Sequence, residues 1–502
     1  MNEKTQKLFH AAFYLLVFFF LYLWFSKIHA LVVFDADDWS YLAYVRMATP
    51  IWGEWNPAKV FPEVVFPFFS TVAAYVLTPL TGDYITAQTL MHAFVVSVSI
   101  TGYLWCFSCL LRRGFSLSRL TASLLTLLFL AFHFLAMRSG EFDNQYLLYC
   151  VDLNCYYNYL LPSLLNASLV MCLIANRKMQ AFLKEGAPAV KGCFYVVVYL
   201  AIFSNLPSSG ILAAYAGSVL LLDLIRRWKQ RHWKRFWGEN AFCLGILAAW
   251  LVSAVFELSG GRASSASDGS SIVYRLYVSC KNLLEAILDC NRIFLLCVFA
   301  ALIIAGITLL LSNGKTDTAR WLISAGTAVL IALAAYGVYT VLLCAAVNPN
   351  SLFRSEYLFG IFFYTVLLSL LALSYLLSRY PKILLTLPLL LLFLVSTIDT
   401  REKTFLESNF ANAAPSVCAE ISRALIRQLQ EADRQGLSET VLRVPLYVSD
   451  PETQDNWPHS LFLVKRIPGT LYAHGLISRN IDVTPVADPA MNKLFHLPIP
   501  GE

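Results

Sequence analysis

Residues 8–33 read LFHAAFYLLVFFFLYLWFSKIHALVV, an apolar run that is long enough to cross a bilayer as one helix. Comparable runs recur along the chain, of whose 502 residues 58% are hydrophobic and only 14% are charged. Soluble domains carry about 25% charged residues, so this composition excludes a water-soluble fold. The first run is too long for a signal-peptide core and has no small-residue cleavage site, so we expect it to be retained as a span.

The stretch 60–81 decides the topology, because it is long enough to cross but contains Pro62, Glu63, Pro67 and Pro79. If it crosses, the basic clusters that follow fall outside, against the excess of Lys and Arg expected in cytoplasmic loops. If it lies along the outer surface, or dips in and returns, every basic cluster falls inside, and we adopt this interpretation. The sequence then predicts about eleven spans, at 8–33, 84–111, 118–137, 159–176, 192–207, 209–225, 239–258, 292–312, 320–346, 356–378 and 382–398.

The chain changes character from Asp399 onward, where the apolar fraction drops and charges of both signs mix. Apolar residues at helical spacing over 415–435 predict an amphipathic helix, and 441–448 predicts a strand. Gly469 and Gly475 suggest turns. These features indicate a small α/β domain.

The predicted fold class is therefore an all-α polytopic membrane protein with a small soluble α/β domain at its C-terminal end. Residues 1–398 form the membrane domain, which includes a long outer loop at 34–83, and residues 399–502 form the soluble domain. The charge bias places the tail on the non-cytoplasmic side.

An acidic segment, FDADDWSYL at 34–42, directly follows the first span. Its three carboxylates, Asp35, Asp37 and Asp38, stand at the membrane face, where charge is costly unless it is solvated, paired or bound to a cation. Crowded carboxylates raise one another's proton affinity, which suits a general base. The alternative is a hydrated loop in which Asp38 simply caps a helix over Trp39–Thr49.

A second acidic group occurs in the outer segment 138–162, where Glu141, Asp143 and Asp152 are interleaved with tyrosines such as Tyr157. Tyrosines offer flat faces and hydroxyl groups, and sugars are bound by both. The alternative is a belt of tyrosines at the membrane interface.

Basic residues are few in the outer segments, and Arg46, Lys59, Arg138 and Arg354 run against the charge bias there. Arg and Lys hold phosphate well where the dielectric is low, so an anionic lipid phosphate is one reason for their presence. For Arg354 the alternative is an internal ion pair with Glu356. The net charge of +6 otherwise comes from short clusters between apolar runs, so no nucleic-acid partner is expected.

The order of these features resembles the GT-C superfamily of glycosyltransferases, in which an acidic motif closely follows the first span and a long outer loop carries membrane-parallel helices. More closely, the chain is similar to bacterial multi-pass proteins of this kind, which pair a DDxxY-like motif with an NYLWPL-like segment and a small soluble domain. The matching residues are 37–41 (DDWSY), 158–162 (NYLLP) and 455–469 (DNWPHSLFLVKRIPG). One departure is that Lys59 stands where these proteins often carry an arginine.

The resemblance implies a transferase that takes a sugar from a polyprenyl-phosphate donor on the non-cytoplasmic side of a bacterial plasma membrane. The acceptor would be a hydroxyl group of a saccharide or lipid destined for cell-surface polysaccharide or glycolipid. The base would be one of Asp35, Asp37 and Asp38, and the phosphate would be held by Lys59, Arg138 or Arg354. Glu141 and Asp143 would bind sugar hydroxyls or a divalent cation, which some members use and others do not.

Two other classes of function are open. A transporter or flippase of a lipid-linked saccharide would place charged residues near the middle of its spans, whereas Asp223 and Glu257 lie near the span ends. A non-catalytic assembly or sensor protein would bind a partner through its outer tail, and its acidic loop would tolerate change.

Overall fold

The computed structural model describes residues 3–43, 58–136, 146–176, 185–228, 233–258, 270–311, 316–396, 414–446, 466–497 and 499. These residues are mostly helical. Their first half contains the helices α1 (Glu3–Leu23), η1 (Trp24–Ile28), α2 (Ala36–Tyr41), η2 (Phe61–Val65), α3 (Phe66–Val72), η3 (Ala73–Leu77), α4 (Thr78–Thr81), α5 (Tyr84–Phe115), α6 (Arg119–Leu135), α7 (Leu153–Cys155), η4 (Tyr156–Leu160), α8 (Leu161–Ala175), α10 (Pro188–Ile202) and α11 (Leu206–Arg227). The second half of the bundle contains α12 (Trp233–Leu258), α14 (Ile272–Leu288), α15 (Arg292–Leu311), α16 (Asp317–Ala346), η5 (Pro349–Phe353), α17 (Ser355–Arg379), η6 (Pro381–Thr386) and α18 (Leu387–Ser396).

The predicted helical membrane protein is confirmed in its coarse features. Within the described residues, nine helices are long and apolar enough to cross a membrane, and three shorter apolar helices accompany them. The long helices are Lys4–Ile28, Phe61–Thr81, Tyr84–Phe115, Leu153–Ala175, Leu206–Arg227, Phe236–Glu257, Arg292–Leu311, Asp317–Ala346 and Ser355–Arg379, and the shorter ones are Arg119–Leu135, Pro188–Ile202 and Pro381–Phe393. Every predicted span coincides with one of these helices, and the exact number of crossings stays a prediction.

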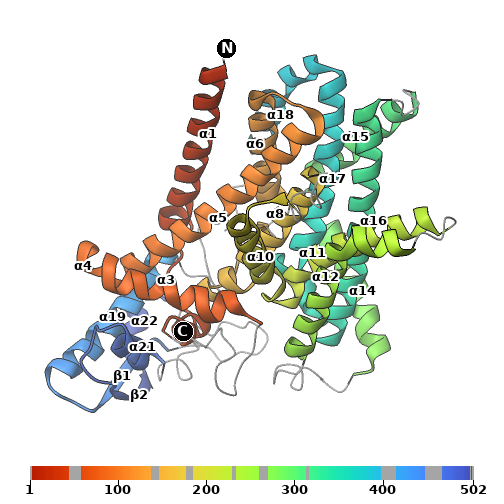
Figure 1. Ribbon diagram of the computed structural model, residues 1–502. Helices are drawn as coiled ribbons and strands as arrows, with labels where there is room; N and C mark the ends of the chain where they lie inside the picture. The colour runs from red at the N-terminus through yellow and green to blue at the C-terminus, as the bar shows by residue number, and fades with distance from the viewer. Residues whose placement is uncertain are drawn as a thin grey trace.

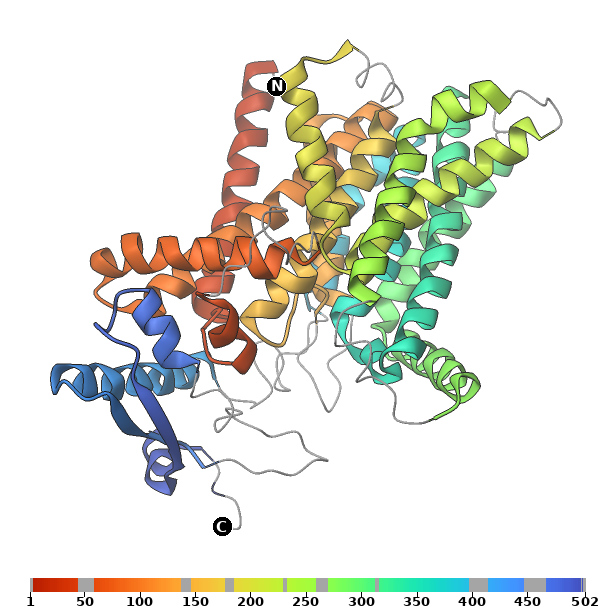
Figure 2. The same cartoon turned by 60° about the horizontal axis from the view of Figure 1, so that its bottom comes forward.

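The helix Phe61–Thr81 meets the length requirement for a span, yet it runs across the direction of α1 and α15 rather than along it (Figures 1 and 2). Its prolines remove backbone donors, so the helix contains the wider turns η2 and η3. Hydroxyl groups bond to carbonyls along it, as Ser70 Oγ does to Phe66 O at 2.9 Å. This orientation supports the interpretation that the stretch lies along the bundle end.

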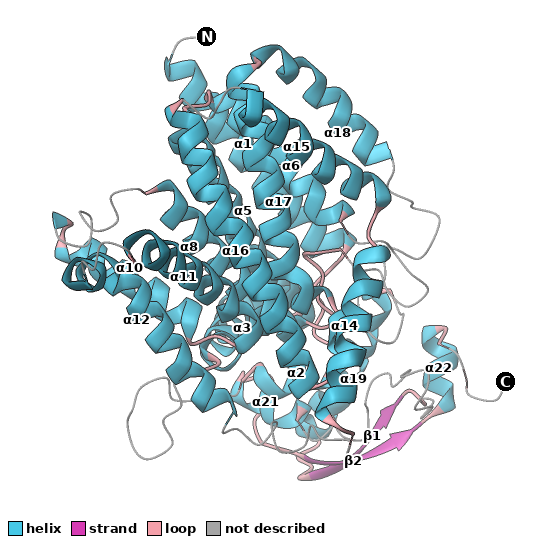
Figure 3. Cartoon of the chain, turned by 90° about the vertical axis from the view of Figure 1, so that its right-hand side faces the viewer, coloured by secondary structure: helices cyan, strands magenta, loops and turns pink. Residues whose placement is uncertain are grey.

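The tail packs as a small unit at the end of the bundle away from the N-terminus (Figure 1). It contains α19 (Pro415–Arg434), β1 (Glu439–Val444), α21 (Ile467–Ala473), β2 (Asp482–Ala487) and α22 (Pro489–Phe495). The two strands pair in parallel, with Glu439 opposite Asp482 and Val444 opposite Ala487, and lie at the rim of the molecule in Figure 3.

The amphipathic helix predicted for the tail is confirmed by α19, which buries Ile421, Leu425 and Leu429. Of the two predicted turns, Gly475 is at one, with φ of +70°, a left-handed conformation that favours glycine. The turn predicted at Gly469 is wrong, because Gly469 lies inside α21, whose second residue is a proline that favours a helix start.

Candidate functional site

The acidic segment that follows the first span begins helix α2. Asp35 is the N-cap, and its Oδ1 accepts a hydrogen bond from Asp37 N at 3.0 Å. Asp38, three residues later, accepts from Asp35 N at 3.2 Å through Oδ2, so the two side chains form a capping box. The suggestion that Asp38 caps a helix starting at Trp39 is wrong, since Asp35 is the cap and α2 starts at Ala36.

Asp38 fastens this segment to the second acidic segment of the sequence. Its side chain is fully buried, and Oδ2 also accepts from Phe34 N at 3.1 Å. Oδ1 accepts from Asn154 N at 2.7 Å, although the two residues are 116 positions apart. Each oxygen of Asp38 therefore accepts from backbone N–H groups, so this carboxylate fixes the acidic segment against residues 152–155.

Asp152, which is the N-cap of α7, belongs to the same cluster. Its Oδ1 accepts from Cys155 N at 2.6 Å, and its Oδ2 accepts from Cys155 Sγ at 3.2 Å. Burial, together with the charges of Asp35 and Asp37, raises the pKa of Asp152 to about 8. Burial, followed by the charges of Asp152 and Asp35, likewise raises the pKa of Asp38 well above its ordinary value. The carboxyl of Asp152 therefore retains its proton at neutral pH.

Asp37 differs from the other carboxylates of the cluster because its side chain is only partly buried. Among the described residues it has no hydrogen-bond partner for its side-chain oxygens. Of the three predicted catalytic residues, Asp37 is the one that an external hydroxyl group can reach.

Arg354 lies beside this cluster, immediately before α17. Its Nη2 is 3.0 Å from Glu356 Oε1 and its Nε is 3.4 Å from Oε2, so the internal ion pair considered from the sequence is present. Nη2 also lies 3.5 Å from Sγ of Cys155, and the guanidinium sits 5.5 Å from the centre of the Tyr159 ring. A guanidinium has five N–H donors, and among the described residues none accepts from Nη1. Glu356 thus holds Arg354 in place, while its Nη1 has no acceptor among the described residues. Cys155 contacts both Arg354 and Asp152 and so connects the two.

Lys59 and Tyr157 are engaged elsewhere. Lys59 has a positive φ of 58°, donates its backbone N–H to Ser204 O at 2.8 Å, and places Nζ 3.6 Å from Oε2 of Glu257. Tyr157 is fully buried, with its hydroxyl 2.6 Å from His92 Nδ1 and its ring stacked on Phe66. The side chain of Tyr157 therefore packs inside the protein, where a sugar has no access.

Four predicted substrate-binding residues lie outside the described residues, namely Arg46, Arg138, Glu141 and Asp143, and their roles stay predictions. In the part of the chain that the structure describes, no group of three His, Cys, Asp or Glu side chains is arranged to hold a metal ion. Oδ1 of Asp35 and both oxygens of Asp38 and Asp152 accept from N–H or S–H donors. This arrangement does not fit a divalent cation at these three residues.

The tail holds the acidic segment on both flanks. Ser422 Oγ donates to Val33 O at 2.8 Å before the aspartates, and Thr470 Oγ1 donates to Trp39 O at 2.9 Å after them. Both contacts are buried. They place the tail and the acidic segment at the same end of the bundle, as the predicted topology requires.

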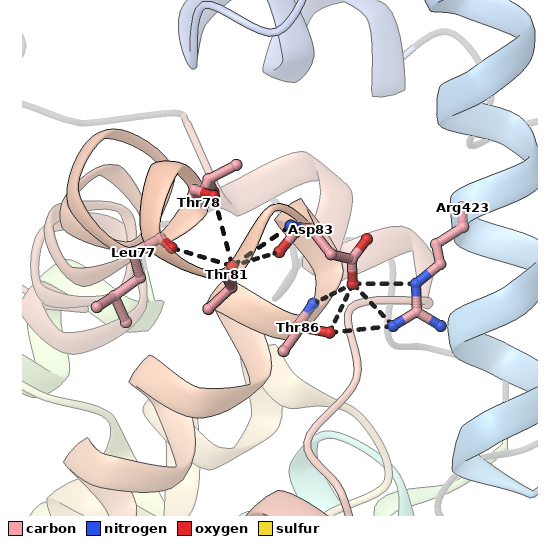
Figure 4. Close-up of polar contacts among 6 residues, drawn as sticks. All are labelled: Leu77, Thr78, Thr81, Asp83, Thr86 and Arg423. Carbon is pink, nitrogen blue, oxygen red and sulfur yellow. Dashed lines mark hydrogen bonds and ion pairs between the residues drawn. The ribbon is translucent and has the colours of Figure 1, made fainter.

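A charged contact at the start of α5 adds to this docking (Figure 4). Asp83 caps α5 through Thr86 N at 2.9 Å, and the same Oδ2 accepts from Arg423 of α19 at 3.0 Å from Nε and 2.8 Å from Nη2. Burial acts to raise the pKa of Asp83, but the hydrogen bonds from Arg423 and Thr86 outweigh it and lower that pKa. Thr81 closes the turn before α5 by bonding to the carbonyl oxygens of Leu77 and Asp83, both at 3.0 Å.

The sequence pointed to Asp152 only as part of a loosely defined acidic group. The signal for its placement is the spacing Asp-Leu-Asn-Cys, in which an acidic N-cap precedes by three residues the backbone N–H from which it accepts.

Comparison with protein-family models, with curated proteins and with solved structures found no match for this chain.

Proposed function

We propose that this protein is a membrane-embedded glycosyltransferase that moves a sugar from a polyprenyl-phosphate donor to an acceptor hydroxyl group, on the side of the membrane where the tail lies. The observation that carries the proposal is that the segment bearing Asp37 meets Arg354 around residues 152–155. A base for the acceptor and a cation for the leaving phosphate are the two groups that such a transfer requires.

The roles follow from accessibility. Asp37 takes the proton of the acceptor hydroxyl as that oxygen forms a bond to the anomeric carbon of the sugar. The bond from this carbon to the donor phosphate breaks, and its electron pair leaves with the polyprenyl phosphate. Arg354 holds the phosphate through its unused N–H groups, and Glu356 keeps the guanidinium oriented. Asp35, Asp38 and Asp152 position the base.

The surroundings suit an amphipathic donor and an envelope acceptor. Asp37 follows the first apolar helix and Arg354 directly precedes α17, so a prenyl chain beside these helices can remain in the bilayer while its phosphate reaches Arg354. We place the reaction on the non-cytoplasmic face of a bacterial plasma membrane, with a saccharide or lipid of the cell surface as the acceptor.

A flippase is supported less well by the positions of the charged groups. Asp223 pairs with Arg227 in the last turns of α11, and Lys59 pairs with Glu257 in the last turn of α12. These described pairs stand at helix ends, whereas a carrier of a charged headgroup is expected to place such groups near the middle of the membrane.

The test is sugar transfer by membranes that contain the full chain and a labelled polyprenyl-phosphate sugar. Asp37→Asn is expected to lower the rate by about 10²-fold or more, because the acceptor loses its base. Arg354→Lys keeps the charge but loses the planar fork, so it is expected to raise the KM for the donor. Equal rates for Asp37→Asn and the unaltered protein, at equal abundance, would refute the assignment.

Asp317→Asn is the matched control, since Asp317 is an aspartate at the opposite end of the bundle whose side chain is 91% exposed. It is expected to leave the rate unchanged. If labelled donor changes leaflets in sealed vesicles while no sugar reaches an acceptor, the flippase is favoured instead.

A further inference from the structure

A cavity of about 470 Å³ lies where the first span, α5 and the tail meet. It is lined by the span end with the residues that follow it, by the first turns of α5, and by the first turns of α19. Ligand pockets are commonly about 300–1,000 Å³, so the space is adequate for a small polar group. This cavity is separate from the contacts around Asp38 and Arg354.

The cavity lies at the end of the first apolar helix, which is the level where lipid headgroups are expected beside a helix that crosses a bilayer. The first span ends at Ile28, which lines the cavity, and the tail closes the opposite wall. On the bundle side, Leu23 of α1 and Phe94 of α5 are exposed by 55% and 47%, as expected of side chains that face lipid chains. A lipid with its chains beside these residues would direct its headgroup into the cavity.

The charges in the wall are of both signs. Lys27 and Glu420 both line the cavity and are exposed, and no ion pair joins either of them to another described residue. Arg423, in the same wall, is already paired with Asp83. The wall therefore holds two cations and one anion, and because Asp83 neutralises Arg423 from outside the lining, one cation, Lys27, and one anion, Glu420, remain for a ligand. This disfavours a purely anionic ligand such as free phosphate and favours one that carries both charges.

We propose that this cavity binds the headgroup of a zwitterionic phospholipid with a primary ammonium group. Lys27 holds the phosphate, and Glu420 accepts hydrogen bonds from the ammonium group. The lipid bridges the first span and the tail, so it fastens the tail to the bundle. This site stands independently of the proposed sugar transfer.

The test uses the full chain in nanodiscs of phosphatidylethanolamine, phosphatidylcholine or phosphatidylglycerol with identical acyl chains, and native mass spectrometry to count retained lipid. Phosphatidylethanolamine is expected to be retained best, because phosphatidylcholine has no ammonium N–H and phosphatidylglycerol has no ammonium. Lys27→Ala and Glu420→Gln are each expected to lower its affinity about tenfold, the effect of losing one charge-assisted hydrogen bond. Lys27→Arg keeps the charge and is expected to retain the lipid.

Controls come from matched residues outside the cavity. Lys382→Ala removes an exposed lysine at another helix end, and Glu431→Gln removes a glutamate from α19 itself, and both are expected to leave retention unchanged. Phosphatidylglycerol retained as well as phosphatidylethanolamine, with no effect of Glu420→Gln, would overturn the proposal in favour of a simple anion site. Unchanged retention in Lys27→Ala, in protein whose thermal unfolding matches the unaltered chain, would overturn it too.

Discussion

Replacing Asp152 with asparagine is expected to stabilise the folded protein at neutral pH and to flatten the pH dependence of its stability. Asparagine caps a helix about as well as aspartate, so the hydrogen bond from Cys155 N is retained, and folding at neutral pH no longer requires an ionised carboxylate to take up a proton. The side chain is 7% exposed, and its charged form is opposed by burial and by Asp35 and Asp37.

The sign and size follow from proton linkage. The folded-state pKa of Asp152 is about 8, above the ordinary value of 3.8, so the folded state binds more protons between these pH values. The free energy of unfolding therefore falls as pH rises through this window. Each pH unit corresponds to at most about 1.4 kcal/mol, so the loss between about pH 5 and about pH 7 is at most ~2.7 kcal/mol. We expect the free energy of unfolding to fall by about 1–2 kcal/mol over this range, because water that enters the site reduces the cost of a buried charge.

The assay is reversible unfolding of the full chain in mixed micelles, followed by tryptophan fluorescence at a series of pH values. Asp317→Asn, which removes an exposed charge, should run parallel to the unaltered protein. A free energy of unfolding that stays level or rises between about pH 5 and about pH 7 would refute the reasoning. So would a slope in Asp152→Asn equal to that of the unaltered protein.

Three further outcomes are expected. Asp38→Ala leaves three buried backbone N–H groups without an acceptor and should lower the free energy of unfolding by about 3 kcal/mol or more; a loss below about 1 kcal/mol would contradict the burial of this carboxylate. A double-mutant cycle with Asp83→Asn and Arg423→Gln should give a coupling of about 1 kcal/mol, because both side chains are about one-third exposed, and this coupling should vanish as pH falls through the lowered pKa of Asp83; a coupling that persists in acid would count against the ion pair. Ser422→Ala combined with Thr470→Val should speed amide hydrogen exchange in α2 but not in α17, as two anchoring hydroxyls are lost; equal exchange in α2 would show that the tail does not hold it.

The coarse fold could be predicted from the sequence because a bilayer imposes its requirements locally. About 20 apolar residues must follow one another for a helix to cross, and each such run is visible without knowledge of its neighbours. The stretch 60–81 is harder, since its length satisfies the requirement and only its orientation in the bundle distinguishes a span from a surface helix. That orientation depends on packing against α5 and on the contact of Tyr75 with Ala473, 398 residues away.

The candidate site could be predicted only in part, for a related reason. The acidic segment is local, so its three carboxylates are evident from the sequence. Their partners are not local, because Cys155 and Arg354 are 199 residues apart and nothing in either segment specifies the other. Tyr157 is a second example of a non-local partner. The tyrosine-rich segment around it suggested sugar binding, but its contact with His92, 65 residues away, places its side chain in the interior.

The division of roles within the acidic segment follows from helix geometry. With Asp35 at the N-cap, Asp38 is the third residue of the helix, and a carboxylate at that position turns back toward the N-cap backbone. Successive residues of a helix are rotated by about 100°, so Asp37 points away from the direction that Asp38 takes. In the spacing D-x-D-D, Asp35 and Asp38 are thus structural carboxylates, and Asp37 is the carboxylate without a structural role. The burial of the side chains agrees with this division, since Asp38 is fully buried and Asp37 is only partly buried. Asp38 could be mistaken for the base, because burial raises its pKa well above its ordinary value, but the backbone already occupies its oxygens.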